Sequence, residues 1–178
     1  METSGDAEPF RDTVIRRVDW AREIEVVRPL FQGYRKWLAD HVDGRSGPDS
    51  NVPPGLAQLD QAIAALPGEY GPPSGDVLLA FNHADIVACG ALRKVESGVG
   101  DIKRIYVRRD HFGPEFGPQL IKALLQRAEE LGYSRVRVDA LPSMESAIQY
   151  YQEMGFKPIQ RYWPHPVSGA LFFEWSAK

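Results

Sequence analysis

The sequence predicts one mixed α/β domain, and three observations support this fold class. Its 178 residues are enough for one sizeable core and few for two. Stretches with the period of a helix and stretches with the period of a strand follow the order strand, two helices, three strands, helix, strand, helix, two strands. No internal repeat or low-complexity segment interrupts this order. We expect residues 1–12 to be disordered and residues 13–178 to form the domain.

The first predicted elements are a strand and a long helix. Thr13–Val18 is predicted as a short strand, after which Asp19 can cap a helix from Trp20 to about His41. Apolar side chains recur along this helix at the three-and-four spacing of one buried face. Pro29 lies inside the helix and is expected to kink it or split it in two.

A loop and a second helix precede a predicted hairpin. Residues 42–54 are rich in Gly, Pro, Ser and Asp and form a candidate lid, and a short helix follows at Leu56–Leu66. Two apolar runs at Asp76–Ala80 and Asp85–Val95 are separated by four residues, which predicts a β-hairpin.

The next predicted strand carries charged residues on both faces. Period-2 alternation along it gives one face Asp101, Lys103, Ile105 and Val107, and the other face Ile102, Arg104 and Tyr106. We therefore expect this strand to be only partly buried.

Alternating helices and strands make up the C-terminal half. An apolar helical stripe runs from Leu120 to Leu131 and ends at Gly132, and a strand with alternating inward valines is predicted at Tyr133–Ala140. The remaining elements are a helix opened by Pro142 and Ser143 and stopped by Gly155, and two strands at Phe156–Tyr162 and Ala170–Ser176.

Composition excludes several classes of partner and site. The net charge of −3, with 21 dispersed basic residues, gives no electrostatic reason to expect nucleic acid. The single Cys89 excludes an intrachain disulfide and lies in an apolar strand, which favours a structural thiol. The four histidines lack metal-ligand spacing, so no metal is expected. Without a signal peptide or membrane span the protein is expected to be cytoplasmic, and a homodimer stays open.

Four motifs, in chain order, resemble those of the GNAT acetyltransferase superfamily. They are Ile105-Tyr106-Val107-Arg108-Arg109, the loop Gly113–Gly117 before a helix, Leu141-Pro142-Ser143-Met144 after the next strand, and AIQYYQEMGF at Ala147–Phe156. The resemblance covers roughly residues 13–176 and is closest to small bacterial N-acetyltransferases. It implies an α/β/α sandwich around a mixed, mostly antiparallel sheet of six to seven strands.

The resemblance also implies a site for acetyl-CoA as co-substrate. In the family, the strand before the loop pairs its backbone with the pantetheine arm, which points to Ile105, Tyr106 and Val107. The loop and the N-terminus of the following helix hold the pyrophosphate. By position, the residues of this second part are Phe112, Gly113, Pro114, Glu115, Phe116 and Gly117.

This loop departs from the family signature Arg/Gln-x-x-Gly-x-Gly/Ala. Phe112 replaces the Arg or Gln, Glu115 replaces the first Gly, and only Gly117 matches. Two functions therefore stay open. One is an N-acetyltransferase that moves acetyl from acetyl-CoA to a primary amine of a small molecule or peptide, by direct attack in a ternary complex. The other is a GNAT-fold binding or regulatory protein with weakened or lost acyl-CoA binding.

Two residues are candidates for catalysis. Tyr151 matches the family tyrosine that donates a proton to the leaving thiolate, but it also lies on the apolar face of its helix, as a core tyrosine would. Asp101 lies where many relatives have a glutamate and could act through water as general base, the alternative being a solvated aspartate at a strand end. Two interpretations stay open for six further side chains: they line an acceptor pocket, or they are a cluster of core and rim aromatics. These six are Tyr34, Trp37, Tyr162, Trp163, His165 and Trp175.

Overall fold

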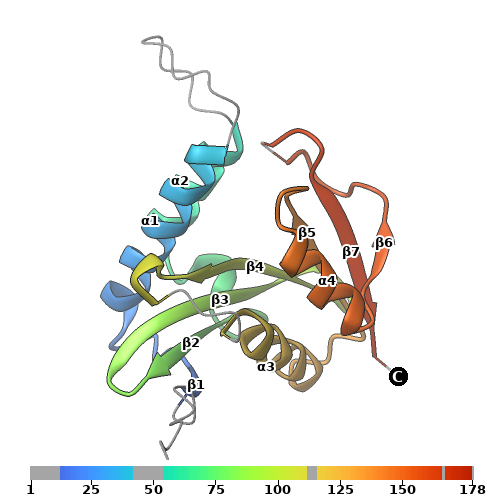
Figure 1. The fold of residues 1–178 in the computed structure, drawn as a ribbon. Helices are drawn as coiled ribbons and strands as arrows, with labels where there is room; N and C mark the ends of the chain where they lie inside the picture. The colour runs from blue at the N-terminus through green and yellow to red at the C-terminus, as the bar shows by residue number, and fades with distance from the viewer. Residues whose placement is uncertain (1–12, 42–53, 112–115, 166, 178) are drawn as a thin grey trace, which may run out of the picture.

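The computed structural model describes residues 13–41, 54–111, 116–165 and 167–177. They form one seven-stranded sheet with helices packed on both faces (Figure 1). The predictions for residues 1–12 and for all but the last residue of the candidate lid at residues 42–54 lie outside the described residues, and Pro54 is the first residue of a helix. Within the described residues, no helix has both the length and the apolar character needed to cross a membrane.

The sheet has the order β1-β2-β3-β4-β5-β7-β6. Only β4 and β5 pair in parallel, and every other neighbouring pair is antiparallel, which confirms the mixed, mostly antiparallel sheet. Its strands are β1 Thr13–Arg17, β2 Asp76–Asn82, β3 Asp85–Glu96, β4 Val99–Val107, β5 Arg135–Ala140, β6 Lys157–Ile159 and β7 Leu171–Ser176. The order of elements and the β2–β3 hairpin agree with the sequence prediction.

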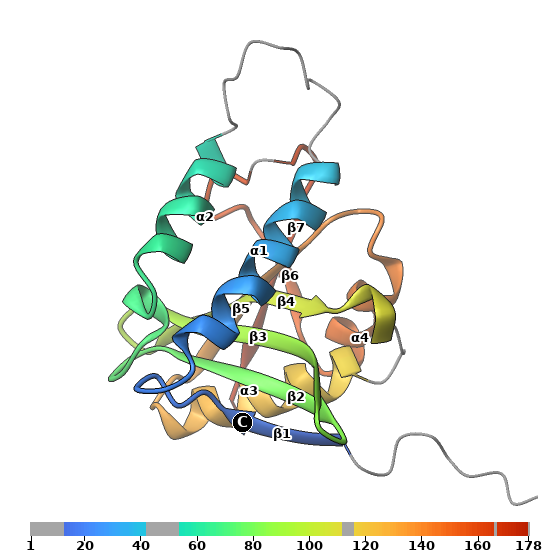
Figure 2. The ribbon, with the colours of Figure 1, turned by 90° about the vertical axis from the view of Figure 1, so that its left-hand side faces the viewer.

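Two helices cover each face of the sheet, so the sandwich is also confirmed. Figure 2 shows α1 and α2 in front of the sheet and α3 behind it. One core cluster joins α1 and α2 to the sheet, and a second joins α3 and α4 to the opposite face. The helices are α1 Ile24–His41, α2 Pro54–Ala64, α3 Phe116–Glu130 and α4 Glu145–Glu153, with short 3-10 turns η1 Gly68–Tyr70 and η2 Arg109–His111.

Helix α1 is continuous through Pro29, so the predicted split into two helices is wrong. The proline removes one N–H donor in the second turn of the helix. The buried face that follows, with Leu30, Phe31 and Leu38, holds the helix against the sheet. The start of the helix was also placed too early, because residues 20–22 form a turn before Ile24.

Strand β4 contains a β-bulge that sequence alternation did not predict. Cys89 of β3 pairs with Tyr106, and Ala91 pairs with Lys103, so one residue of β3 lies opposite Arg104 and Ile105. Arg104 has a φ of +58°, in the left-handed region. After this extra residue, each side chain of β4 points to the face opposite to the one that strict alternation predicts.

Because of the bulge, the predicted faces of β4 are wrong from Arg104 onward. Lys103 and Arg104 both line a cavity on the side covered by α1 and α2. Ile105 instead joins Ile102 in the core beneath α3. The charged side chains predicted on both faces of this strand thus gather on one.

Helix α3 begins at Phe116, within the predicted loop, and ends before Gly132. Gly132 and Gly155 adopt φ values of +84° and +90°, as expected of glycines that terminate helices. Cys89 is fully buried, which agrees with a structural thiol, and burial raises its pKa to about 12. Such a thiol is unreactive at neutral pH.

Gly75 packs too closely against η1 to accept a side chain. A Cβ at this position would overlap the carbonyl oxygen of Glu69 and lie 2.7 Å from backbone atoms of Tyr70. Because backbone atoms cannot rotate away, we expect Gly75→Ala to lower the free energy of unfolding by about 2 kcal/mol. At Gly117 a Cβ would meet no described atom within 4 Å apart from its chain neighbours and its own helix backbone, so Gly117→Ala should be neutral or slightly stabilising. Urea unfolding of both variants tests this, and equal stabilities would contradict it.

Candidate active site

Strands β4 and β5 separate near the middle of the sheet. Their parallel ladder pairs only residues 99–101 with residues 135–137, although β4 continues to Val107 and β5 to Ala140. A narrow gap of about 40 Å³ lies between them, with Ile105 on one side and Tyr151 of α4 among its lining residues. Since no described strand pairs with β4 on this side beyond Asp101, the strand edge offers backbone donors and acceptors to an extended ligand.

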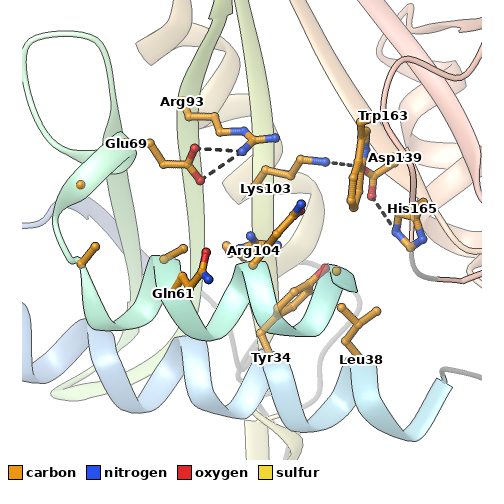
Figure 3. Close-up of a pocket in the computed structure, with 15 residues that line it drawn as sticks. Tyr34, Leu38, Gln61, Glu69, Arg93, Lys103, Arg104, Asp139, Trp163 and His165 are labelled. Atoms are coloured by element: carbon orange, nitrogen blue, oxygen red, sulfur yellow. Dashed lines mark hydrogen bonds and ion pairs between the residues drawn. The ribbon is translucent and has the colours of Figure 1, made fainter. Parts of the chain in front are cut away.

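A larger cavity of about 380 Å³ lies on the face covered by α1 and α2 (Figure 3). It shares part of its wall with the gap, including Lys103, Arg104 and Asp139. Tyr34 of α1 and His165, from the segment between β6 and β7, also line both spaces. The two spaces thus meet along a shared set of side chains.

At one end of the cavity, the lining residues Glu69, Arg93 and Lys103 belong to a network around the buried Asp101. Arg93 of β3 donates to the carboxylate of Glu69 at 2.9 Å and to one oxygen of Asp101 at 3.1 Å. The other oxygen of Asp101 accepts a hydrogen bond from the Tyr162 hydroxyl at 2.8 Å. Asp101 is 0% exposed, so the predicted alternative of a solvated strand-end aspartate is wrong. Both of its oxygens are engaged.

The network continues to Asp139 of β5. The Lys103 ammonium lies 3.5 Å from Asp101 and donates to Asp139, which also accepts a hydrogen bond from the Trp163 indole at 3.0 Å. His165 Nε2 lies 3.4 Å from the other oxygen of Asp139. Burial alone would raise the pKa of Asp139, but the charge of Lys103 and the hydrogen bond from His165 hold this pKa well below its usual range.

His165 enters this network as a neutral donor. Its Nδ1 accepts a hydrogen bond from the backbone N–H of Val167 at 3.0 Å, so that nitrogen carries no proton. The proton therefore lies on Nε2 and points to Asp139.

Arg104 differs from the other charged residues of the wall. Among the described residues, no carboxylate forms an ion pair with it, and its buried Nε has no hydrogen-bond partner. The guanidinium carbon lies 5.5 Å from the ring centre of Tyr34 and 5.9 Å from that of Tyr70. Burial raises the pKa of Tyr34, an effect that the nearby Arg104 charge opposes.

The structure brings some of the predicted aromatic residues together and separates others. Tyr34, Trp163 and His165 line the cavity, and Trp37 lines the gap. Trp175 packs against the core on the α3 side, so it does not belong to a pocket with the others. Sequence reasoning missed Arg93, Lys103, Arg104 and Asp139 as site residues.

Tyr151 is 2% exposed and packs against Phe156 and Phe173, with ring centres 5.4 and 6.0 Å away. It also lines the gap between β4 and β5, so its position fits both predicted roles. Burial raises the pKa of Tyr151, and the nearby Asp139 raises it further. The hydroxyl therefore stays protonated at neutral pH.

The predicted cofactor residues lie along the edge of β4 and at the start of α3. Ile105, Tyr106 and Val107 form the end of β4, and the Tyr106 ring packs against Gly33 of α1. Phe116 points into the core, and Gly117 follows it in the first turn of α3. The other predicted residues lie outside the described ones: Phe112, Gly113, Pro114 and Glu115. Among the described residues, no group of three or more His, Cys, Asp or Glu could hold a metal ion.

Comparisons with known proteins identify relatives of this chain. Residues 47–156 match the model of the acetyltransferase (GNAT) family. An uncharacterized N-acetyltransferase of Schizosaccharomyces pombe is 32% identical over 116 residues, which cover 64% of this chain and 71% of that protein.

Solved structures show a similar fold at low sequence identity. An acetyltransferase from Streptococcus agalactiae has a TM-score of 0.70 at 15% identity, with 94% of this chain and 100% of that chain covered. A putative acetyltransferase from Salmonella typhimurium, solved with its cofactor acetyl-CoA, has a TM-score of 0.62 at 16% identity, with 92% and 93% covered.

The depressed pKa of Asp139 predicts a pH-dependent contribution to stability. A carboxylate whose folded pKa lies below its unfolded value of about 3.9 stabilises the fold above that value and loses this effect as the pH falls below it. Asp139→Asn leaves Lys103 without its strongest partner, so we expect it to cost about 3 kcal/mol at pH 7 and clearly less at pH 3.

Chemical unfolding at the two pH values measures this difference. Asp85→Asn, at an exposed position of the β2–β3 hairpin, is the matched control and should change stability little at either pH. An Asp139→Asn effect that is the same at pH 7 and pH 3 would contradict the stated role of the ion pair.

Proposed function

Because this chain belongs to the GNAT family of acetyltransferases, we propose that it is an N-acetyltransferase acting on a primary amine of a small molecule or peptide. In this proposal the amine attacks acetyl-CoA directly in a ternary complex. The observation that carries the proposal is the junction of two spaces: a narrow gap between β4 and β5, and a larger cavity that shares part of its wall. One space suits an extended acyl donor and the other suits a compact acceptor.

Acetyl-CoA is the proposed donor. Its pantetheine arm would lie along the open edge of β4 at Ile105, Tyr106 and Val107, where β5 has already diverged. Its pyrophosphate would lie at the N-terminus of α3, a fifteen-residue helix whose first turn contains Gly117. Apart from its chain neighbours and helix backbone, no described atom lies within 4 Å of a Cβ built at Gly117, so no described side chain fills the space beside the backbone there. The related structure with acetyl-CoA supports this choice of donor.

The proposed chemistry places Tyr151 at the leaving group. A neutral amine attacks the thioester carbonyl, a C–N bond forms, the C–S bond breaks, and the thiolate takes a proton. Tyr151 lines the gap and its hydroxyl is protonated, so it is suited to donate that proton. Asp101 was predicted as a general base acting through water. Its occupied oxygens favour a positioning role instead, in which it holds Arg93 and Lys103 in place.

The competing function, a GNAT-fold protein without effective acyl-CoA binding, rests on Phe112, Pro114 and Glu115. These residues lie outside the described part of the chain, so this function depends on their identity alone. The two functions make opposite predictions about CoA binding.

Isothermal titration calorimetry with acetyl-CoA and CoA separates the two functions. For an acetyltransferase we expect a dissociation constant in the micromolar range, about −8 kcal/mol in free energy. NAD serves as the control nucleotide and should not bind. Absence of CoA binding at millimolar concentrations would reject the acetyltransferase and favour the binding or regulatory protein.

Tyr151→Phe tests the proton donor. The substitution keeps the ring that packs against Phe156 and Phe173 and removes only the hydroxyl, so we expect kcat to fall about 100-fold while acetyl-CoA affinity is unchanged. Release of the CoA thiol can be followed with a thiol reagent, because the buried Cys89 does not react. Tyr150→Phe, on the next residue of α4, is the control. If kcat is unchanged in Tyr151→Phe, Tyr151 is only a core residue.

A further inference from the structure

We propose that the acceptor is an amino-acid-like small molecule, an amine that also carries a carboxylate, and that Arg104 binds this carboxylate. This inference rests on the proposed function, because it names the class of acceptor that the cavity would take. Three features of the cavity wall support it: the pairing of its charges, the way Arg104 is held, and its volume.

Arg104 is the one cation of the described wall that has no carboxylate partner. Arg93 already binds Glu69 and Asp101, and Lys103 already binds Asp101 and Asp139. Arg104 instead has a buried Nε without a hydrogen-bond partner. The Arg104 side chain also lines the cavity, and a guanidinium presents a planar fork of donors that matches a carboxylate, so a ligand carboxylate would give Arg104 the charged partner that the described residues do not supply.

The charge balance of the wall favours a zwitterionic acceptor. The wall carries the carboxylates Glu69 and Asp139 and the cations Arg93, Lys103 and Arg104. Asp101, which does not line the cavity, pairs with Arg93 and Lys103, so the network as a whole holds three negative and three positive charges. His165 is neutral and adds nothing to this sum. A zwitterion leaves the buried charge balanced, whereas a simple ammonium adds an uncompensated positive charge beside Arg104.

The backbone and two tyrosines hold the Arg104 side chain toward the cavity. A φ of +58° is unfavourable for a residue with a long side chain and persists only where the surrounding structure enforces it. Here the bulge turns the side chain to the cavity face, where the rings of Tyr34 and Tyr70 flank the guanidinium. The donor group is thus oriented before a ligand binds, which reduces the entropy lost on binding.

The volume of the cavity fits a small acceptor. About 380 Å³ lies at the lower end of the range of small-molecule sites. It accommodates an amino acid with its side chain. A carboxylate held by Arg104 would orient such a molecule in a cavity whose wall continues into the gap that contains Tyr151.

The first test compares ligands that differ only in the carboxylate. The N-acetyl derivatives of the common amino acids, which are the products of the proposed reaction, are titrated into the protein in the presence of CoA, each beside its primary amide. We expect at least one acid to bind about tenfold or more tightly than its amide, because a hydrogen bond to a charged group is lost in the amide. The proposal is overturned if every amide binds as well as its acid, or if no acid binds.

The second test changes the arginine. In Arg104→Gln the preference for the acid should fall to about one, while the affinity for the amide stays within about twofold. Arg104→Lys should retain part of the preference, since it keeps the charge without the planar fork. Arg22→Gln removes a charge at an exposed position and is the matched control, with the preference unchanged. An undiminished preference for the acid in Arg104→Gln would reject the assignment to Arg104.

The two proposals fail in different ways. One outcome is that acetyl-CoA binds and amines without a carboxylate are acetylated as fast as amino acids. The protein is then an acetyltransferase, but Arg104 does not select a carboxylate. If acetyl-CoA does not bind, the acid–amide comparison is repeated without CoA. A preference for acids that Arg104→Gln abolishes then supports the carboxylate site in a protein that is not an acetyltransferase, and its absence rejects that site too.

Discussion

The candidate active site depends on one extra residue in the central strand β4. The bulge at Arg104 sets two residues of β4 against one of β3, and it follows shortly after the parallel pairing with β5 has ended at Asp101. A bulge bends a strand and increases its local twist. β4 therefore turns away from β5 where the gap begins, and Lys103 and Arg104 both reach the cavity. A regular strand would have sent one of these two charges into the apolar core beneath α3.

The charges gathered on that face are costly to bury, which is informative about their role. Removing an ion from water costs several kcal/mol, and a buried ion pair often contributes no net stability compared with apolar residues of the same size. Here Asp101 is 0% exposed and Lys103 is 5% exposed, and both are enclosed by partners. An apolar wall would pack this face at lower cost. A polar network retained at the junction of two spaces is therefore better explained by ligand binding than by stability.

Sequence patterns predicted the elements well because each element depends on local chemistry. The stop of α3 at Gly132 and the turn between Asp76–Asn82 and Asp85–Glu96 follow from backbone preferences and apolar periodicity. The bulge was missed because it depends on pairing with a strand that is distant in sequence, and one residue of shift reverses every face after it. The burial of Asp101 was missed for the same reason: Arg93 and Tyr162, which enclose it, come from another strand and a loop. The predicted split at Pro29 did not occur, because the packing of the buried face of α1 outweighs a single lost backbone hydrogen bond.

The described residues also bear on how an acetyl group would be transferred. A double-displacement route needs a nucleophile that carries the acetyl group between the two substrates, and a cysteine is a common choice. Cys89 is the only cysteine in the chain, it is fully buried in β3, and burial raises its pKa to about 12. Its thiol faces the carbonyl oxygen of Arg104 at 3.6 Å rather than the cavity. Lys103 is the lysine that lines the cavity, but its nitrogen is engaged by the carboxylates of Asp101 and Asp139. Neither side chain is therefore placed to carry an acetyl group, and the proposed direct attack by the acceptor on the thioester requires no such carrier.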